Sequence, residues 1–133
     1  MRMAYRRQKY GNIKTRTADG IEHDSRKEAR RWNELLLLER AGEISDLRRQ
    51  VKYVLIPKQT ESVERYSERT GRRLKDAERT IESECSYIAD FVYVDSATGK
   101  TVVEDSKGGV RTKEYRIKKK LMLFVHGVKI HET

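Results

Sequence analysis

A single predicted β-hairpin, over residues 81–107, constrains the fold of this chain most. Its two halves are rich in strand-forming side chains, and a short polar stretch with the turn signal Thr98-Gly99 joins them. A turn over residues 95–100 sets a register in which Asp90 lies opposite Asp105. Opposite residues of antiparallel strands have Cβ atoms about 4.5–5.5 Å apart, so the hairpin predicts two neighbouring carboxylates.

The carboxylate pair predicts a metal site. Asp is disfavoured inside a strand as apolar as the one around Asp90, so its position needs a reason. Two carboxylates this close repel unless one is protonated or a cation lies between them, and oxygen ligands suit Mg²⁺ or Mn²⁺. Lys107 shares the strand face of Asp105, about 6–7 Å further along. Two acids, a lysine and a hard cation are the equipment for phosphodiester hydrolysis. A register slip of one residue would instead put Asp90 on the opposite face.

Two helices are expected on either side of the hairpin in the sequence. Ser25 is the expected N-cap of the first, which runs to about Ala41 and ends at Gly42. Thr112 is expected to cap the second, which ends at Gly127. The predicted inner stripe of the second helix consists of Tyr115, Ile117, Leu121, Phe124 and Val125.

Further strands are expected at residues 51–56 and 128–130. The order helix, strand, long loop, strand, strand, helix, strand predicts an α/β or α+β fold with helices on a mixed sheet. We divide the chain into a basic N-terminal arm, residues 1–18, and a single domain, residues 19–133. Within that domain, residues 58–80 are a polar, inserted excursion that we expect to be exposed and partly helical, with Gly71 as a break.

Glu28, in the first predicted helix, has two interpretations. As the third residue after Ser25, it completes a capping box. It also lies one turn before Trp32, at the edge of the apolar helix face, and from there it can point at the carboxylate pair. We favour the second interpretation, because a capping glutamate has no need to lie beside the apolar stripe.

The net charge of +9 is concentrated in two segments. Residues 1–16 carry six basic side chains and no acid, and residues 107–120 carry seven basic side chains and one acid, so together they carry +12. A near-neutral body with two basic segments is typical of a protein that binds a polyanion, most commonly nucleic acid. The arm residues that we expect to contact nucleic acid are Arg6, Arg7, Lys9 and Lys14.

Composition excludes several other classes. No apolar run approaches the roughly 18–20 residues of a membrane span, and the N-terminus lacks the apolar stretch of a secretory signal. The single cysteine, Cys85, excludes a disulfide framework and a cysteine-based zinc finger. We therefore expect no membrane partner and a reducing, cytoplasmic setting.

Four stretches carry a resemblance to a known family: residues 24–31 around Glu28, residues 41–44, residues 86–93 around Asp90, and residues 102–108 around Asp105-Ser106-Lys107. Together they resemble the PD-(D/E)XK nuclease superfamily, and within it a phage and prophage family of endonuclease-I-like, Holliday-junction-resolvase-like members. The likeness covers most of residues 10–130.

The resemblance implies a restriction-endonuclease-like αβββαβ core and Mg²⁺-dependent (or Mn²⁺-dependent) hydrolysis of DNA. Asp90, Asp105 and the Ser106 carbonyl would bind the metal, Lys107 would be the catalytic lysine, and Glu28 would hold or orient the metal or its water. Gln50 resembles a glutamine that recurs ahead of the second strand in related nucleases. The residues of the second helix that would meet the phosphate backbone are Lys113, Lys118, Lys119 and Lys120.

From this likeness we expect branched or junction DNA as the substrate and a homodimer as the active form. For a phage protein, the location is the cytoplasm of the host cell. Two alternatives stay open. One is a non-catalytic nucleic-acid-binding accessory protein of a phage, and the other is a nuclease that acts on linear DNA or on RNA.

Overall fold

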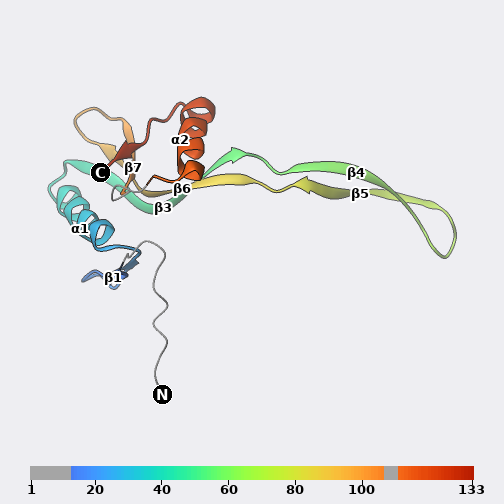
Figure 1. Ribbon diagram of the computed structural model, residues 1–133, viewed down its shortest axis with the longest axis horizontal. Coiled ribbons are helices and arrows are strands. Elements are labelled where there is room, and N and C mark those ends of the chain that lie inside the picture. Colours follow the sequence, from blue (N-terminus) through green and yellow to red (C-terminus); the bar gives the residue numbers. More distant parts are fainter. Residues whose placement is uncertain (1–12, 107–110) are drawn as a thin grey trace, which may run out of the picture.

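The computed structural model describes residues 13–106 and 111–133, which form a mixed α/β fold around a four-stranded sheet (Figure 1). The strands lie in the order β3 (Ile44–Ile56), β6 (Cys85–Asp95), β7 (Thr101–Asp105) and β8 (His131–Glu132). The first three are antiparallel, and β8 is parallel to β7. The expected mixed sheet with helices is therefore confirmed.

A two-stranded sheet precedes the first helix and is held against it. β1 (Thr15–Arg16) pairs with β2 (Glu22–His23), so the predicted N-terminal arm includes a short strand. Asp19, in the turn between them, accepts hydrogen bonds from the Thr17 hydroxyl, from the Ile21 amide at 3.2 Å and from Trp32 Nε1 at 2.6 Å. The turn is thereby attached to α1 (Arg26–Arg40).

Both described helices are capped as the sequence predicts. The Ser25 hydroxyl accepts a hydrogen bond from the Glu28 amide, and the Thr112 hydroxyl accepts one from the Tyr115 amide, each at 3.1 Å. α2 (Lys113–His126) ends at Gly127, whose φ of +66° suits a residue without a Cβ. Neither of these helices has the length and apolarity that crossing a membrane requires.

The two helices cover opposite faces of the sheet. On one face, α1 contributes Trp32 and Leu35 to a core with Phe91 and Tyr93. On the other face, α2 packs over β3 and β6, and the core consists of Leu55, Tyr87, Ala89, Val92, Val103, Tyr115, Met122 and Ile130. β6 lies between β3 and β7 and supplies buried residues to both cores (Figure 1).

The predicted inner stripe of α2 is largely wrong. Tyr115 is buried and Leu121 packs partly against the core, but Ile117, Phe124 and Val125 are exposed. Met122, which the stripe omitted, is fully buried. The helix is rotated because Lys118 and Lys119 lie half-buried on the inner side, where long lysine stems can cover apolar surface while their charged ends reach solvent. A stripe drawn from apolar residues alone does not include them.

The hairpin register is confirmed, while two strand boundaries differ from expectation. Val94 pairs with Thr101 and Phe91 with Glu104, as a turn over residues 95–100 requires. β3 begins at Ile44, several residues before the predicted strand, because residues 44–50 pair with β6 despite their polarity. The last strand is β8 at residues 131–132 rather than 128–130.

The excursion over residues 58–80 is exposed but not helical. It forms a second antiparallel pair, β4 (Gln59–Tyr66) and β5 (Arg73–Glu82), which leaves the body as a long ribbon continuing from β3 and β6 (Figure 1). The helical expectation was wrong, because β3 and β6 are already paired antiparallel where they leave the sheet and β4 and β5 continue that pairing.

Candidate functional site

The two predicted carboxylates meet where β6 and β7 lie side by side. The β6–β7 ladder ends at the pair Phe91–Glu104, and Asp90 and Asp105 are the next residue of each strand beyond it. The Ser106 amide donates a hydrogen bond of 2.8 Å to Asp90 Oδ2, so Asp90 also joins the two strands through its side chain. Asp105 is buried, whereas Asp90 is partly accessible to solvent. The carboxylates thus lie at the edge of the protein interior.

Two tyrosines enclose this pair from the α2 side. The Tyr87 hydroxyl donates a hydrogen bond to Asp105 Oδ2. Burial raises the pKa of Tyr87 well above its usual range, and the charges of Asp105 and Asp90 raise it further. Burial and the charges of Asp105 and Glu132 likewise raise the pKa of Tyr115, whose ring centroid is 6.4 Å from that of Tyr87. Both phenols therefore stay protonated, and Tyr87 holds Asp105 as a donor.

Asp90 lies at an irregularity of β6, where the usual alternation of side chains between the two faces of the sheet is interrupted. In β6, Ala89 packs in the α2 core, whereas Phe91 packs in the α1 core. Gln50 of β3 lies opposite Asp90, between the flanking pairs Arg49–Phe91 and Val51–Ala89, and has a φ of +53°. A left-handed backbone is costly for a residue with a Cβ, and such irregularities in strands often lie beside functional sites.

Glu28 belongs to a buried polar cluster on α1, next to this irregularity. Its Oε1 lies 3.5 Å from Gln50 Nε2 and 3.5 Å from His23 Nδ1. His23 Nε2 lies 3.3 Å from the Thr17 hydroxyl. The backbone amide of Glu28 bonds to Ser25, but its carboxylate contacts Gln50 and His23 and does not complete the capping box. Gln50 is therefore the link between Glu28 and the strand position opposite Asp90.

The electrostatics of Glu28 differ from those of an exposed acid. Burial raises the pKa of its carboxyl group, and the neighbouring charge of Asp24 raises it further. His23 and Arg49 oppose this shift in part. A buried carboxyl group with a raised pKa can take up and release a proton closer to neutral pH than an ordinary glutamate can.

Glu104, adjacent to Asp105, lies on the other face of β7. It is fully buried and pairs with Arg31 of α1, whose Nε lies 2.5 Å from Glu104 Oε1. Successive side chains of a strand point to opposite faces, so Glu104 and Asp105 face opposite sides of the sheet. Phe91, the β6 partner of Glu104, likewise lies in the α1 core, whereas its neighbour Val92 lies in the α2 core. Glu104 is thus part of the contact between α1 and the sheet and not of the carboxylate pair.

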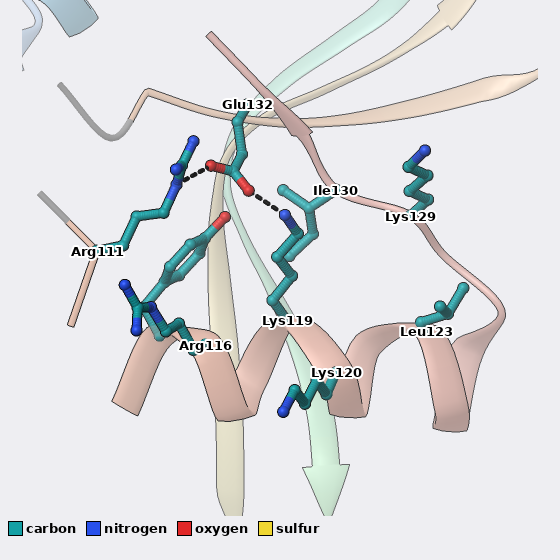
Figure 2. A pocket seen from close by; sticks show the side chains of 9 residues that line it. Arg111, Arg116, Lys119, Lys120, Leu123, Lys129, Ile130 and Glu132 are labelled. Carbon is teal, nitrogen blue, oxygen red and sulfur yellow. Dashed lines mark hydrogen bonds and ion pairs between the residues drawn. The ribbon is translucent and has the colours of Figure 1, made fainter. Parts of the chain in front are cut away.

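A basic cavity of about 550 Å³ lies between α2 and the segment before β8 (Figure 2). Glu132 is the acidic residue that lines it, and it pairs with Arg111 at 2.5 Å and with Lys119. The lysine hydrogen bond lowers the pKa of Glu132, so this carboxylate stays ionised among the cations. The basic lining residues are Arg111, Arg116, Lys119, Lys120 and Lys129.

Tyr115 connects the basic cavity with the carboxylates. It lines the cavity, and the charge of Asp105 acts on its hydroxyl. Asp105 also pairs with Glu132 along the β7–β8 ladder. The basic cavity and the carboxylate pair are therefore adjacent, with Tyr115 between them.

The predicted phosphate contacts are distributed over more than one surface. Lys119 and Lys120 line the basic cavity, whereas Lys118 lines a second cavity of about 340 Å³ with Tyr87, and Lys113 is exposed at the start of α2. Lys14 is exposed and lies 3.6 Å from Glu22. The sequence analysis missed Arg111, Arg116 and Lys129 as cavity residues, although the first two stand in the basic segment that it identified. Arg6, Arg7, Lys9 and Lys107 lie outside the described residues.

The donor set at the carboxylate pair fits a hard cation. Among residues 13–106 and 111–133, no group of three or more His, Cys, Asp or Glu side chains is arranged to hold a metal ion. Mg²⁺ is commonly held by one or two carboxylates, with water and substrate phosphate completing its shell. Asp90 and Asp105 provide those two carboxylates. The Ser106 hydroxyl beside them is buried and has no hydrogen-bond partner among the described residues.

Comparison with known proteins gives one match. The model of a family described as "Protein of unknown function (DUF1064)" matches residues 7–131. No curated protein and no solved structure matches the chain.

Proposed function

We propose that this chain, which belongs to the DUF1064 family, is a metal-dependent endonuclease that hydrolyses phosphodiester bonds in DNA. The observation that carries the proposal is the position of two carboxylates, Asp90 bonded to the Ser106 amide and Asp105 bonded to Tyr87, near a cavity lined by five basic side chains. Binding of a polyanion alone gives no reason to place two acids there, because they repel phosphate. A cation between the acids removes that repulsion and attracts the same phosphate.

The order of the elements supports a restriction-endonuclease-like core as part of this proposal. α1, β3, β6, β7, α2 and β8 follow one another as helix, three strands, helix and strand, and the β4–β5 ribbon is inserted between the first two strands. In such a core the site would lie on the central strands, where Asp90 and Asp105 are found.

In the proposed mechanism, Asp90, Asp105 and the Ser106 carbonyl would hold Mg²⁺ or Mn²⁺. When bound, such an ion lowers the pKa of a water molecule and offsets the charge of the phosphate. The Ser106 amide fixes Asp90, and the Tyr87 hydroxyl fixes Asp105, so both carboxylates are oriented before substrate binds.

The remaining residues would position substrate and move protons. Lys107 directly follows Ser106, and we propose it as the cation that stabilises the transition-state charge. Glu28, held by His23 and Gln50, would orient water or exchange a proton. Arg111, Lys119 and the other basic side chains around their cavity would bind the flanking phosphates.

Two further parts of the proposal come from the sequence resemblance. The substrate is branched or junction DNA, and the active form is a homodimer. Two symmetry-related sites would let one dimer cut two strands. From the same resemblance and from the composition, we propose a cytoplasmic location, in the host cell if a phage encodes the protein.

The test is a cleavage assay with labelled four-way junction, linear duplex, single-stranded DNA and RNA, each with Mg²⁺, Mn²⁺ or EDTA. The variants are Asp90→Asn and Asp105→Asn, which keep side-chain size and remove one negative charge. The matched control is Asp46→Asn, which removes the same charge from an exposed carboxylate at a φ of +51° that Asn tolerates.

We expect metal-dependent cutting that each site variant reduces by roughly a hundredfold or more and the control leaves unchanged. A preference for the junction would support the resolvase part of the proposal. Binding of DNA without cutting under every metal would refute the nuclease and leave a nucleic-acid-binding accessory protein. Cutting of RNA alone would refute the DNA substrate.

A further inference from the structure

The β4–β5 ribbon is the part of the fold that neither the core nor the proposed active site explains. It extends far from the sheet, and neither hydrophobic core contains a residue of it (Figure 1). Its strands pair from Gln59 and Glu82 at the base to Tyr66 and Arg73 at the tip. The tip closes with two backbone hydrogen bonds of 2.8 Å, from Ser67 N to Arg72 O and from Gly71 N to Ser67 O. With about 3.3 Å per residue, eight strand residues span roughly 26 Å.

The two ends of the ribbon have opposite charge. The tip, residues 65–75, carries five basic side chains and one acidic one, a net charge of +4. The base, residues 58–64 and 76–84, carries two basic side chains and six acidic ones, a net charge of −4. A solvated hairpin with no partner has no need for such a separation, because neighbouring opposite charges along the strands would stabilise it better.

The basic side chains of the tip are available for a partner. Within the described part of the chain, Arg65, Arg69, Arg72 and Lys75 form no ion pair, and all four are exposed. At the base, by contrast, Glu61 pairs with Arg79, and Glu84 lies 2.5 Å from Lys52. The cations are thus left without counter-charges at the end of the ribbon that reaches furthest from the body.

The shape of the tip fits a groove of duplex DNA. A two-stranded β-ribbon can enter the major groove, which is about 12 Å wide, and arms of this kind also follow the minor groove. Tyr66 and Leu74 are exposed at the tip, 56% and 41%, and give it apolar surface between the charges. An isolated two-stranded ribbon is only marginally stable, so one of this length gains most when a partner covers it.

We propose that the tip of the β4–β5 ribbon, residues 65–75, is a DNA-binding arm that enters a groove of duplex DNA. Arg65, Arg69, Arg72 and Lys75 contact phosphates on the two sides of the groove, and the acidic base keeps the rest of the ribbon away from the backbone. The tip of a second copy is a poorer occupant, because each tip carries a net charge of +4 and two tips repel each other. The arm shares its DNA partner with the proposed nuclease but needs no catalysis.

The test measures DNA affinity by fluorescence anisotropy with the full-length protein in EDTA, on a 30-base-pair duplex at several salt concentrations. The tip variant is Arg69→Gln/Arg72→Gln. The matched control, Lys58→Gln/Lys100→Gln, removes the same charge from exposed lysines at the base of the ribbon and at the turn before β7. A third variant replaces residues 64–76 with Asn-Gly, which joins the opposed pair Val63 and Ala77 by a two-residue hairpin turn.

We expect the tip variant to bind roughly tenfold more weakly, with a salt slope lower by about 2, since each lost phosphate contact lowers it by about 0.9. The shortened ribbon should lose at least as much affinity, while the control stays near wild type. Equal affinity of the tip variant and the control refutes the proposal, as does a change in oligomeric state without a change in DNA affinity. Failure of wild type to bind DNA refutes the arm, whereas the nuclease is refuted separately, by absence of cleavage in Mg²⁺ or Mn²⁺. Tip-dependent binding without cleavage in Mg²⁺ supports the arm and refutes only the nuclease.

Discussion

Gln50 and Asp90 lie opposite each other on β3 and β6, at the point where both strands exchange the faces of their side chains. Gln50 has a φ of +53° there, and its side chain reaches Glu28 of α1. The irregularity therefore turns the backbone around Asp90 and brings the amide of Gln50 to the buried glutamate. Strain of this kind persists when the surrounding packing holds it.

The first prediction concerns this strained residue. Gln50→Gly should raise the free energy of unfolding by up to about 1 kcal/mol, because it removes the Cβ from a left-handed conformation. Gln50→Val should lower it by about 1–2 kcal/mol, because a branched side chain fits that conformation worst. Chemical denaturation measures both changes. A valine variant at least as stable as the glycine variant would contradict the positive φ.

The same pair of variants bears on the site. Both remove the amide that contacts Glu28, so both should cut DNA more slowly than wild type if the proposed nuclease is correct. In the glycine variant, lower activity would accompany higher stability, and unfolding cannot explain that combination.

The second prediction concerns the buried pair of Arg31 and Glu104. Arg31→Gln leaves Glu104 charged and fully buried without its partner, and should lower the free energy of unfolding by roughly 2–3 kcal/mol. Arg30→Gln is the matched control, since Arg30 is exposed on the same helix and should change stability by less than about 0.5 kcal/mol. Similar effects of the two substitutions would show that the pair does not hold α1 on the sheet.

The third prediction concerns acid unfolding. Hydrogen bonds from the Thr17 hydroxyl and from Trp32 lower the pKa of Asp19 from 3.8 to about 2. A carboxyl group whose pKa is lower in the folded state than in the unfolded state stabilises the fold at every pH above the unfolded-state pKa. This contribution is lost as the pH falls toward the folded-state pKa of about 2. The stability difference between wild type and Asp19→Asn should therefore shrink between pH 4 and pH 2.

Trp32 is the sole tryptophan and donates to Asp19, so its fluorescence can follow this transition in both proteins. Asp76→Asn, at an exposed carboxylate of the ribbon, is a suitable control. A difference between wild type and Asp19→Asn that stays constant over this pH range would show that Asp19 does not titrate as described.

The fourth prediction tests the orientation of α2. Met122 is fully buried, and Phe124 is 88% exposed. Met122→Ala should cost roughly 2–5 kcal/mol of unfolding free energy, whereas Phe124→Ala should change it by less than about 0.5 kcal/mol. Thermal or chemical unfolding measures both changes. A larger loss of unfolding free energy in Phe124→Ala than in Met122→Ala would show that the inner face of α2 is the one predicted from the sequence.

Local features of the chain could be predicted from the sequence because neighbouring residues decide them. The caps Ser25 and Thr112 bond to amides three residues away, and the turn before β7 sets the register that pairs Phe91 with Glu104. These interactions need no knowledge of the remaining fold. The helix caps and the hairpin register were therefore foreseen, together with the order of the main helices and strands along the chain.

Contacts between distant segments were decided only by the tertiary structure. The lysine stems on the inner side of α2 turn Phe124 outward, and Gln50 joins Glu28 because α1 lies across the irregularity of β3. The polar residues 59–82 form a ribbon because β3 and β6 leave the sheet already paired. No periodic pattern in the sequence encodes these outcomes, because each depends on the burial and pairing that a second, remote segment provides.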